Sequence, residues 1–320
     1  MSAEPAPIAP HECEAFAATA RALEANVTRA VQVPAQSLHH VIVALLAEGH
    51  VLVEDYPGVG KTALARALAR SIDCQFARVQ GTSDLLPADV VGANIYDQRE
   101  QEFRFRPGPV FANVVLVDEI NRASPKTQSG LLECMQERRV TVDGQTHELA
   151  RPFLVLATQN PIEYEGTYPL PEAQVDRFMI RISLGYPDPA AEAGMLEAHQ
   201  NGDQVLALTP VATAAELLAA QDAAARVRAA APLREYIVSL LWRTREDPRV
   251  ELGASPRAGL MLLRAAKAHA MMSGRDHALP DDVQALAEPV LAHRLVLTPE
   301  TPRTGARQVI LDAIHAVRAL

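Results

Sequence analysis

The fold is decided by residues 54–62, which read Glu54-Asp55-Tyr56-Pro57-Gly58-Val59-Gly60-Lys61-Thr62. An apolar run at residues 51–53 precedes this stretch, and a helical pattern follows it to residue 71. Glycines let backbone N–H groups approach phosphate oxygens, and the N-terminal end of a helix favours an anion. The strand–loop–helix context therefore predicts a loop that binds the phosphates of a nucleotide. The predicted contacts are Pro57, Gly58, Val59, Gly60, Lys61, Thr62 and Ala63.

Two side chains of this loop have separate tasks. Lys61 supplies a point charge for the β- and γ-phosphates, and the Thr62 hydroxyl is placed to ligate Mg²⁺. The general pattern G-x-x-x-x-G-K-[ST] has glycine where this chain has Asp55. Judged on the loop alone, a chance Gly-Lys-Thr turn is the alternative to a phosphate site.

Polar residues at the ends of two further apolar strands favour the phosphate site. Residues 114–117 form a buried strand that ends in Asp118 and Glu119. We predict that Asp118 holds Mg²⁺ through water and that Glu119 orients and deprotonates the attacking water. The strand at residues 153–157 leads to Asn160, whose amide would position the same water. The alternatives are a solvated strand end for the carboxylates and a turn residue before proline for Asn160.

Composition narrows the classes of function. The chain has 320 residues, of which 48% are apolar and 22% charged, with a formal net charge of −9. No dense Lys/Arg run is present, so a general nucleic-acid binder is disfavoured. Three widely spaced cysteines favour a reducing compartment, and neither a secretory signal nor a membrane-spanning apolar run is found. We therefore expect a cytoplasmic protein without a membrane span.

The order of apolar segments predicts an α/β fold with an all-helical region after it. Apolar strands at residues 51–53, 76–79, 114–117 and 153–156 alternate with helices, which is typical of a parallel sheet covered on both faces. Two hairpins interrupt the alternation, at residues 94–106 and 139–149. Strands are expected to cease after residue 189, and Trp242 is expected to pack among the helices that follow. The predicted units are an N-terminal tail and helix (1–28), a nucleotide-binding α/β domain (29–187) and a helical lid (188–320).

Four longer stretches give the chain a family resemblance. They read VDEINRASPKTQ at residues 117–128, LLECMQER at 131–138, ATQNP at 157–161 and LPEAQVDRF at 170–178. With the phosphate loop, they make the chain similar to the AAA+ ATPases and, within them, to the MoxR family, over roughly residues 30–320. The resemblance implies an AAA+ core with two β-hairpin inserts and a helical lid. It also implies ATP hydrolysis in a hexameric ring, with nucleotide bound between neighbouring subunits.

The resemblance assigns roles to three residues near the predicted site. Asn160 matches the sensor 1 position, and Arg177 matches the arginine finger that reaches the γ-phosphate held by the next subunit. Arg257 matches sensor 2, at the start of a lid helix. Fixed cations of this kind stabilise the charged transition state of phosphoryl transfer. A surface salt bridge is the alternative for either arginine, and the competitors for the finger are Arg122, Arg138 and Arg181.

Two further expectations concern Asp55, which replaces the glycine of the general phosphate-loop pattern, and the client protein on which the ring would act. Glu-Asp-x-Pro-Gly loops like the one at Asp55 occur within the MoxR branch, so this residue becomes a branch marker. The hairpins match inserts placed on the upper face or pore of the ring. There Phe103, Phe105 and Arg106 would contact a client, or would pack within the ring.

Several functions fit these features. The leading one is remodelling or activation of a partner protein in a chaperone-like way, and the family commonly works with von Willebrand factor type A domain proteins. The ATPase motor of a metal chelatase shares the inserts and the lid. A nucleic-acid translocase is disfavoured by the acidic balance, and a nucleotide-gated scaffold without turnover is disfavoured because Lys61, Thr62, Asp118, Glu119 and Asn160 are all present.

Overall fold

The core of the molecule is a parallel five-stranded sheet, seen in a computed structural model that describes residues 8–160, 167–186, 189, 192–194, 203–302 and 304–318. The strand order is β2-β5-β8-β1-β9, and every neighbouring pair is parallel. The strands are β1 (Val51–Glu54), β2 (Phe76–Gln80), β5 (Val114–Asp118), β8 (Leu154–Gln159) and β9 (Ile180–Ile182). Because the strands are parallel, the polar residues that end β1, β5 and β8 lie along one edge of the sheet.

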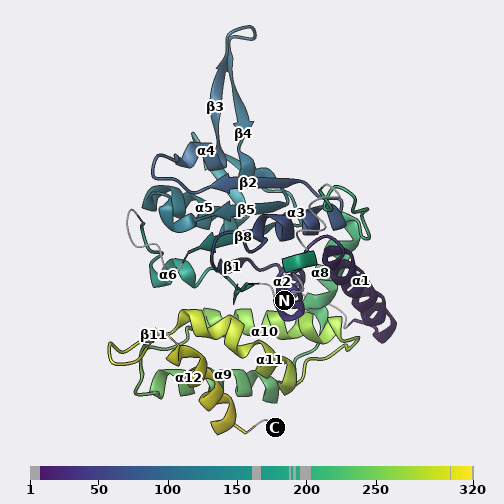
Figure 1. The fold of residues 1–320 in the computed structure, drawn as a ribbon, viewed down its shortest axis with the longest axis vertical. Helices are drawn as coiled ribbons and strands as arrows, with labels where there is room; N and C mark the ends of the chain where they lie inside the picture. The colour runs from purple at the N-terminus through teal and green to yellow at the C-terminus, as the bar shows by residue number, and fades with distance from the viewer. Residues whose placement is uncertain are drawn as a thin grey trace, which may run out of the picture.

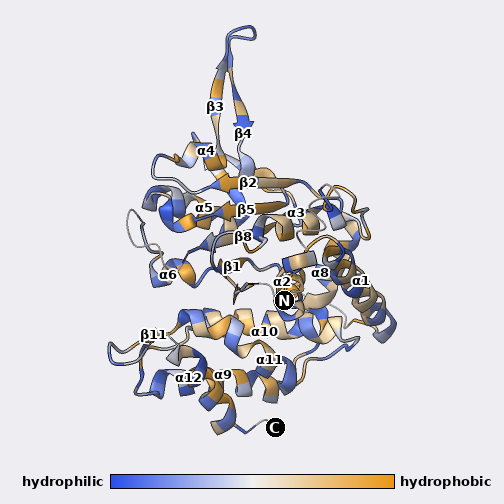
Figure 2. Cartoon of the chain, in the orientation of Figure 1, coloured by the Kyte–Doolittle hydropathy of each residue, from blue (hydrophilic) through white to orange (hydrophobic). Residues whose placement is uncertain are grey.

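Both faces of the sheet are covered, which explains why its three central strands, β1, β5 and β8, are apolar over most of their length. Successive side chains of a strand point to opposite faces. In β5, Val114 and Leu116 belong to one core cluster, whereas Val115 and Val117 belong to the other. The first cluster includes residues of α1 (Pro10–Thr28), α2 (Ala35–Leu46) and α3 (Lys61–Ser71), and the second includes residues of α5 (Pro125–Glu137). Figure 2 shows the central strands in the colours of hydrophobic residues.

Two hairpins extend from this layered core, as the sequence predicts. The first consists of β3 (Gly92–Asp97) and β4 (Glu102–Pro107), follows α4 (Pro87–Val91), and projects far out of the body (Figure 1). The second consists of β6 (Arg139–Val142) and β7 (Gln145–Glu148). Its turn places Asp143 and Gly144 at φ 48° and 79°, which is the backbone that tight hairpin turns require.

The lid is a separate layer of helices on the side of the core opposite the first hairpin (Figure 1). Two of its helices begin at side-chain N-caps: Thr213 accepts from the Glu216 N–H, and Ser255 accepts from the Ala258 N–H. The helices of this layer are α9 (Ala231–Glu246), α10 (Pro256–Met272), α11 (Pro280–Leu291) and α12 (Gly305–Ala316), whereas α8 (Ala214–Arg226) lies beside α1 and α2 (Figure 1). The predicted boundary at 187 lies outside the described residues, and of the predicted helix at residues 190–200 only residues 192–194 are described, all of them helical.

Two expectations about the architecture are wrong, and one strand of the sheet was missed. Strands do not cease after residue 189, because β10 (Val250–Leu252) pairs with β11 (Val296–Leu297) in an antiparallel ladder within the lid. The sheet strand β9 was not foreseen, because its three residues are interrupted by Arg181. Trp242 does not pack among the helices: it is 55% exposed, with the Arg245 guanidinium 5.3 Å from its ring centre. Within the described ranges, no helix is long and apolar enough to cross a membrane.

Candidate functional site

The phosphate loop connects the end of β1 to the start of α3. Gly58 and Gly60 have φ values of 83° and 91°, which only glycine adopts without strain, and Gly60 is the residue before the first turn of α3. Val59 is 5% exposed and anchors the loop in the core. The Lys61 ammonium donates to the carbonyls of Asp55 (3.1 Å) and Tyr56 (3.0 Å). Both acceptors are uncharged, so the charge of Lys61 remains available for an anion.

Asp118 and Glu119, at the end of β5, both contact one buried hydroxyl, that of Thr158. Thr158, on β8, is fully buried, and its Oγ1 donates to Asp118 Oδ1 (2.7 Å). The same hydroxyl oxygen accepts from the Glu119 N–H (2.9 Å). Glu119 has left-handed backbone angles (φ 55°, ψ 51°), which are uncommon for a residue other than glycine. The hydroxyl therefore fixes both the Asp118 carboxylate and the turn that carries Glu119.

Strand β2 contributes two polar side chains that the sequence reasoning missed. Arg78 donates to Asp118 Oδ2 (2.8 Å), and Gln80 donates to Glu119 Oε2 (3.0 Å). Glu119 Oε2 also accepts from Arg122 (3.3 Å). Nothing in the sequence of β2 marks these two side chains as part of a site. The signal is the register, because β2 pairs directly with β5 and places Gln80 opposite Asp118.

The chain next to Gln80 passes unusually close to the turn at Glu119. The Gly81 N–H donates to the Asp118 carbonyl (2.7 Å), and a Cβ at Gly81 would collide with the Glu119 carbonyl. A glycine is therefore required at this position by the close approach of two backbones. It brings the end of β2 to the end of β5.

A cavity of about 320 Å³ lies where these elements meet. It brings together predicted residues from the phosphate loop, from β5 and from the end of β8, which are far apart in the chain. The glycine-rich loop, one ammonium and two carboxylates form a donor set that fits a nucleotide triphosphate with a hard divalent cation. The lining residues are Pro57, Gly58, Gly60, Lys61, Thr62, Ala63, Arg78, Gln80, Asp118, Glu119 and Asn160.

Comparison with known proteins agrees with this geometry. Residues 50–180 match the ATPase family associated with various cellular activities (AAA), and residues 243–313 match the AAA lid domain. Chaperone MoxR1 of Mycobacterium tuberculosis is 43% identical over 310 residues, which are 93% of this chain and 82% of that protein. The chain belongs to the MoxR family of AAA+ ATPases. This confirms the resemblance read from the motifs, together with the AAA+ core and helical lid.

Two further relatives extend the match. The uncharacterised protein YeaC of Bacillus subtilis is 50% identical over 87% of each chain. The crystal structure of a proposed ATPase from Cytophaga hutchinsonii superposes with a TM-score of 0.89 at 37% identity, covering 97% of both chains. The whole described arrangement of core and lid is therefore shared with a solved structure.

The two arginines that the MoxR resemblance singles out do not line the cavity. Arg257 is the second residue of α10, two residues after the cap residue Ser255. Arg177 follows Asp176, whose carboxylate is 3.3 Å from the Ser255 hydroxyl. Asp176 also accepts from Arg294 Nε (2.8 Å), so the segment that carries Arg177 is attached to the lid.

Three competing arginines are engaged within their own chain. Arg138 pairs with Glu48 (2.8 Å) and Arg181 pairs with Glu54 (3.0 Å). Arg122 pairs with Glu119 (3.3 Å), which lines the cavity. In the described part of the chain no carboxylate pairs with the Arg177 guanidinium. Its side chain is half-buried, and among the described residues it is the one of the four without a carboxylate partner.

The client residues predicted on the first hairpin fall into two environments. Phe103 is 71% exposed and touches the ring of Tyr96 at 5.3 Å between centroids. Phe105 instead stacks on His147 of the second hairpin (3.8 Å, 12°) and meets Phe111 edge-on (5.5 Å). Phe105 therefore joins the two hairpins, whereas Phe103 remains free to contact a client.

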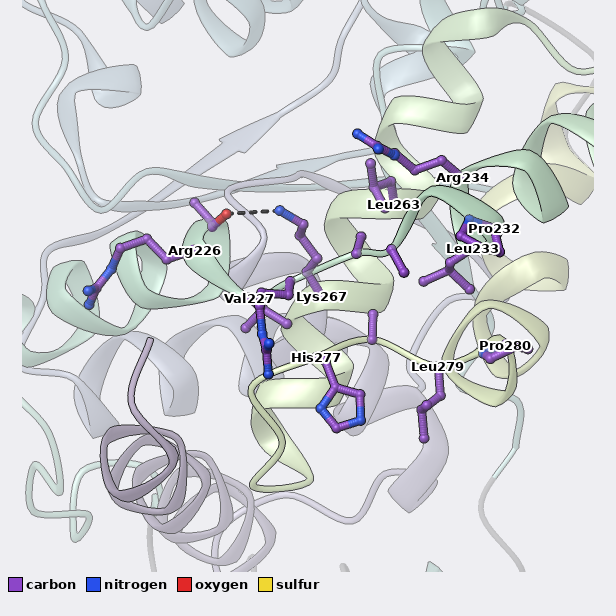
Figure 3. A pocket seen from close by; sticks show the side chains of 15 residues that line it. Arg226, Val227, Pro232, Leu233, Arg234, Leu263, Lys267, His277, Leu279 and Pro280 are labelled. Carbon is purple, nitrogen blue, oxygen red and sulfur yellow. Dashed lines mark hydrogen bonds between the residues drawn. The ribbon is translucent and has the colours of Figure 1, made fainter. Parts of the chain in front are cut away.

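A second hollow, of about 1030 Å³, lies in the lid and shares no lining residue with the phosphate cavity (Figure 3). It lies between the end of α8, the start of α9 and the middle of α10. Lys267 points into it and donates to the Ala225 carbonyl (3.0 Å), and burial lowers the pKa of this ammonium. Among the described residues, no group of His, Cys, Asp and Glu side chains is arranged to hold a metal ion by itself.

Proposed function

We propose that this MoxR-family protein hydrolyses ATP to ADP and phosphate and uses the cycle to remodel or activate a partner protein. The observation that carries the proposal is the single cavity lined by Lys61, Thr62, Asp118, Glu119 and Asn160. Chance surface residues would not converge from the ends of three strands and one helix. The convergence matches the needs of phosphoryl transfer, in which catalysis consists of positioning and charge stabilisation.

Each side chain then has a distinct task. Lys61 would exchange its two carbonyl acceptors for phosphate oxygens. Thr62 and Asp118 would hold Mg²⁺, which would neutralise charge on the phosphates. Glu119 would accept a proton from the attacking water, and Asn160 would orient that water. Thr158 holds the Asp118 carboxylate and the turn that carries Glu119, because its hydroxyl donates to Asp118 Oδ1 and accepts from the Glu119 N–H.

The proposed active form is a ring, as in the hexamers implied by the AAA+ resemblance. Arg177 would be the finger inserted into the neighbouring subunit's site, and Arg257 would contact the nucleotide from the lid. Support comes from the ion pairs that occupy Arg122, Arg138 and Arg181. An arginine supplied in trans makes hydrolysis depend on assembly.

The proposed client is a protein, with a von Willebrand factor type A domain protein as the expected partner, and the proposed location is the cytoplasm. One relative is named a chaperone, which supports the class of activity. The first hairpin supports a contact with another chain, since it extends beyond the body of the molecule with Phe103 and Tyr96 exposed (Figure 1). Exposed aromatic side chains are favoured anchors in protein interfaces.

Two substitutions test the proposal. Lys61→Ala removes the charge that faces the phosphates, and we expect loss of fluorescent ADP binding. Glu119→Gln keeps the shape of the side chain and leaves the phosphate loop intact, so we expect ADP binding to persist. ATP turnover should fall about 10²- to 10⁴-fold, because the amide cannot accept the proton of the attacking water. Gln308→Glu, on the exposed side of α12, is the control substitution away from the cavity, and it should bind labelled ADP and turn over ATP like the wild type. Turnover per subunit should also rise with protein concentration, and unchanged hydrolysis in Glu119→Gln would refute the mechanism.

A further inference from the structure

Asp55 occupies the position that the general phosphate-loop pattern gives to glycine, and its side chain is not a passive replacement. It is 2% exposed, and both carboxylate oxygens are engaged. Oδ1 accepts from the Tyr56 N–H (2.9 Å). Oδ2 accepts from the N–H groups of Leu184 and Gly185 (2.8 Å for Gly185) and from the Ser183 hydroxyl (3.2 Å). A buried carboxylate with this many donors is a fixed part of the structure.

The three residues that donate to Oδ2 begin the connection from the core to the lid. Residues 183–186 follow β9, the edge strand of the sheet, and the lid helices come after them in the chain. Gly185 has φ 65°, so the chain turns at the residue whose N–H binds Asp55. The Ser183 carbonyl also accepts from Ser37 in the first turn of α2 (2.8 Å). The start of this connection is therefore held at Asp55 on one side and at α2 on the other.

A ring contact lies beside these hydrogen bonds. Tyr56 and Tyr186 stack with 5.3 Å between ring centroids and 14° between planes. The two rings are 36% and 73% exposed, so the stack lies at the surface above the buried carboxylate. Consecutive residues of the phosphate loop thus contact consecutive residues of the connection, one pair through a carboxylate and one through aromatic rings.

The same two loop residues hold the phosphate-binding lysine. Lys61 donates to the carbonyls of Asp55 and Tyr56, and Asp55 N–H donates to the Gln159 carbonyl (3.1 Å), next to Asn160. A phosphate that draws Lys61 away would release both carbonyls at once. Any resulting shift of residues 55 and 56 acts directly on residues 183–186, because the carboxylate and the tyrosine ring are attached there.

We infer that Asp55 is a positioning residue that ties nucleotide occupancy of the phosphate loop to the core–lid connection at residues 183–186. This inference rests on the proposed ATP site and adds a route by which binding reaches the lid. Asparagine cannot replace the carboxylate, since it has a single acceptor oxygen. Whichever way its amide turns, backbone N–H groups of Tyr56 or of Leu184 and Gly185 would face an NH₂ group.

The test is hydrogen–deuterium exchange of the peptide that covers residues 183–186, measured with and without ADP in the full chain. In the wild type we expect ADP to change this exchange. In Asp55→Asn and Asp55→Gly we expect exchange without nucleotide to be about tenfold faster or more, because the amides lose their acceptor. The change on adding ADP should then be lost, although labelled ADP still binds.

A kinetic comparison separates this role from a general loss of stability. For Asp55→Gly we expect kcat to fall about tenfold while KM for ATP changes less than about twofold, because the loop still binds phosphate but no longer moves the lid. Loss of folded protein would also lower the apparent kcat without altering KM, so kcat is expressed per molecule that binds labelled ADP; after that normalisation, a loss of folded protein alone leaves both kcat and the exchange response unchanged. Ser183→Ala, which removes one of the four donors, is the graded control and should show a smaller effect in the same direction.

Tyr186→Ala keeps the inference testable if the Asp55 variants fail to fold, because its ring is largely exposed. We expect this variant to bind ADP and to show a reduced exchange response at residues 183–185. Wild-type exchange that ignores bound ADP, or an Asp55→Gly variant with the wild-type response, would overturn the inference and leave the ATPase proposal standing. A wild type that binds no labelled ADP would refute the ATPase proposal, and this inference with it.

Discussion

Cationic side chains serve opposite purposes at the phosphate cavity and at the junction between core and lid. At the cavity, Lys61 donates to two carbonyls and has no carboxylate partner among the described residues, whereas Arg78 pairs there with Asp118 (2.8 Å). At the junction, the lid residue Arg294 is 6% exposed and bonded to Asp176, a residue of the core. Arg264 of α10 likewise donates to the carbonyls of Ala47 and Glu48 on the sheet side.

The difference teaches how charge is allocated in this molecule. A buried cation must be fully paired, because desolvation costs several kcal/mol per ion otherwise. Burial lowers the pKa of Arg294 to about 10, even though the Asp176 carboxylate acts to raise it. A cation that binds a phosphate must instead be left available. We therefore expect Lys61, which has no carboxylate partner among the described residues, to mark the place for the anion, whereas the paired Arg294 attaches the lid to the core.

The largest effect is expected where an unpaired cation is removed. Arg177→Ala should lower turnover about 10³-fold in the assembled protein, because a finger in trans stabilises the charge of the transition state. Binding of labelled ADP should not change. Arg181→Ala, which breaks the pair with Glu54, is the matched control, and its turnover should fall less than about tenfold. A large loss in Arg181→Ala with none in Arg177→Ala would assign the finger to Arg181.

Removing a paired cation at the junction should act on stability. Arg294→Met leaves the Asp176 carboxylate without its main partner, and we expect the free energy of unfolding in urea to fall by about 3–5 kcal/mol. The control is Arg249→Met, whose pairs with Asp247 and Asp312 are partly exposed. That variant should lose no more than about 1 kcal/mol. Equal losses in the two variants would contradict the distinction between buried and exposed pairs.

The buried side chain of His50, directly before β1, makes the free energy of unfolding depend on pH. His50 Nδ1 accepts from the Val155 N–H (3.1 Å), so Nε2 donates to the Met135 carbonyl (3.0 Å) and the ring is neutral. Burial lowers the pKa of His50 to about 4. The unfolded chain takes up this proton near pH 6.5, so the contribution of His50 is complete above that pH. It is lost as the pH falls to 4, by about 3 kcal/mol in total.

The variant His50→Asn isolates this contribution. It keeps an acceptor for Val155 but has no titrating group, so it should be less stable than the wild type at pH 7. The difference in unfolding free energy between the two proteins should shrink as the pH falls from 6.5 to 4. Urea unfolding at several pH values measures it. A constant difference across this window would show that His50 is not the titrating group.

The smallest expected effect separates the two aromatic residues of the first hairpin. Phe105→Ala should cost about 1–2 kcal/mol, since the ring stacks on His147 and meets Phe111. Phe103→Ala should change the unfolding free energy by less than about 0.5 kcal/mol, because the ring is exposed. If Phe103 contacts a client, only its variant should lose client-stimulated turnover while remaining fully stable.

The sequence by itself determined the phosphate loop, the carboxylates that end β5, and the layered fold. These are local features: glycines at positive φ, an apolar strand before the loop and a helix after it follow from neighbouring residues. The alternating core clusters likewise follow from the two-residue period of a strand. Local chemistry was enough to name Lys61, Thr62, Asp118 and Glu119 and to expect that they meet.

The tertiary structure alone decided which further residues join them. Arg78 and Gln80 reach the carboxylates through the pairing of β2 with β5, and strand register is set by the whole sheet. The sequence marks Asp55 as a departure from a pattern. Its partners, Leu184 and Gly185, are 129 and 130 residues further along the chain. Contacts between residues so far apart in the chain depend on the packing of the whole core. The hydrogen bonds of Asp55 could therefore be found only in the folded molecule.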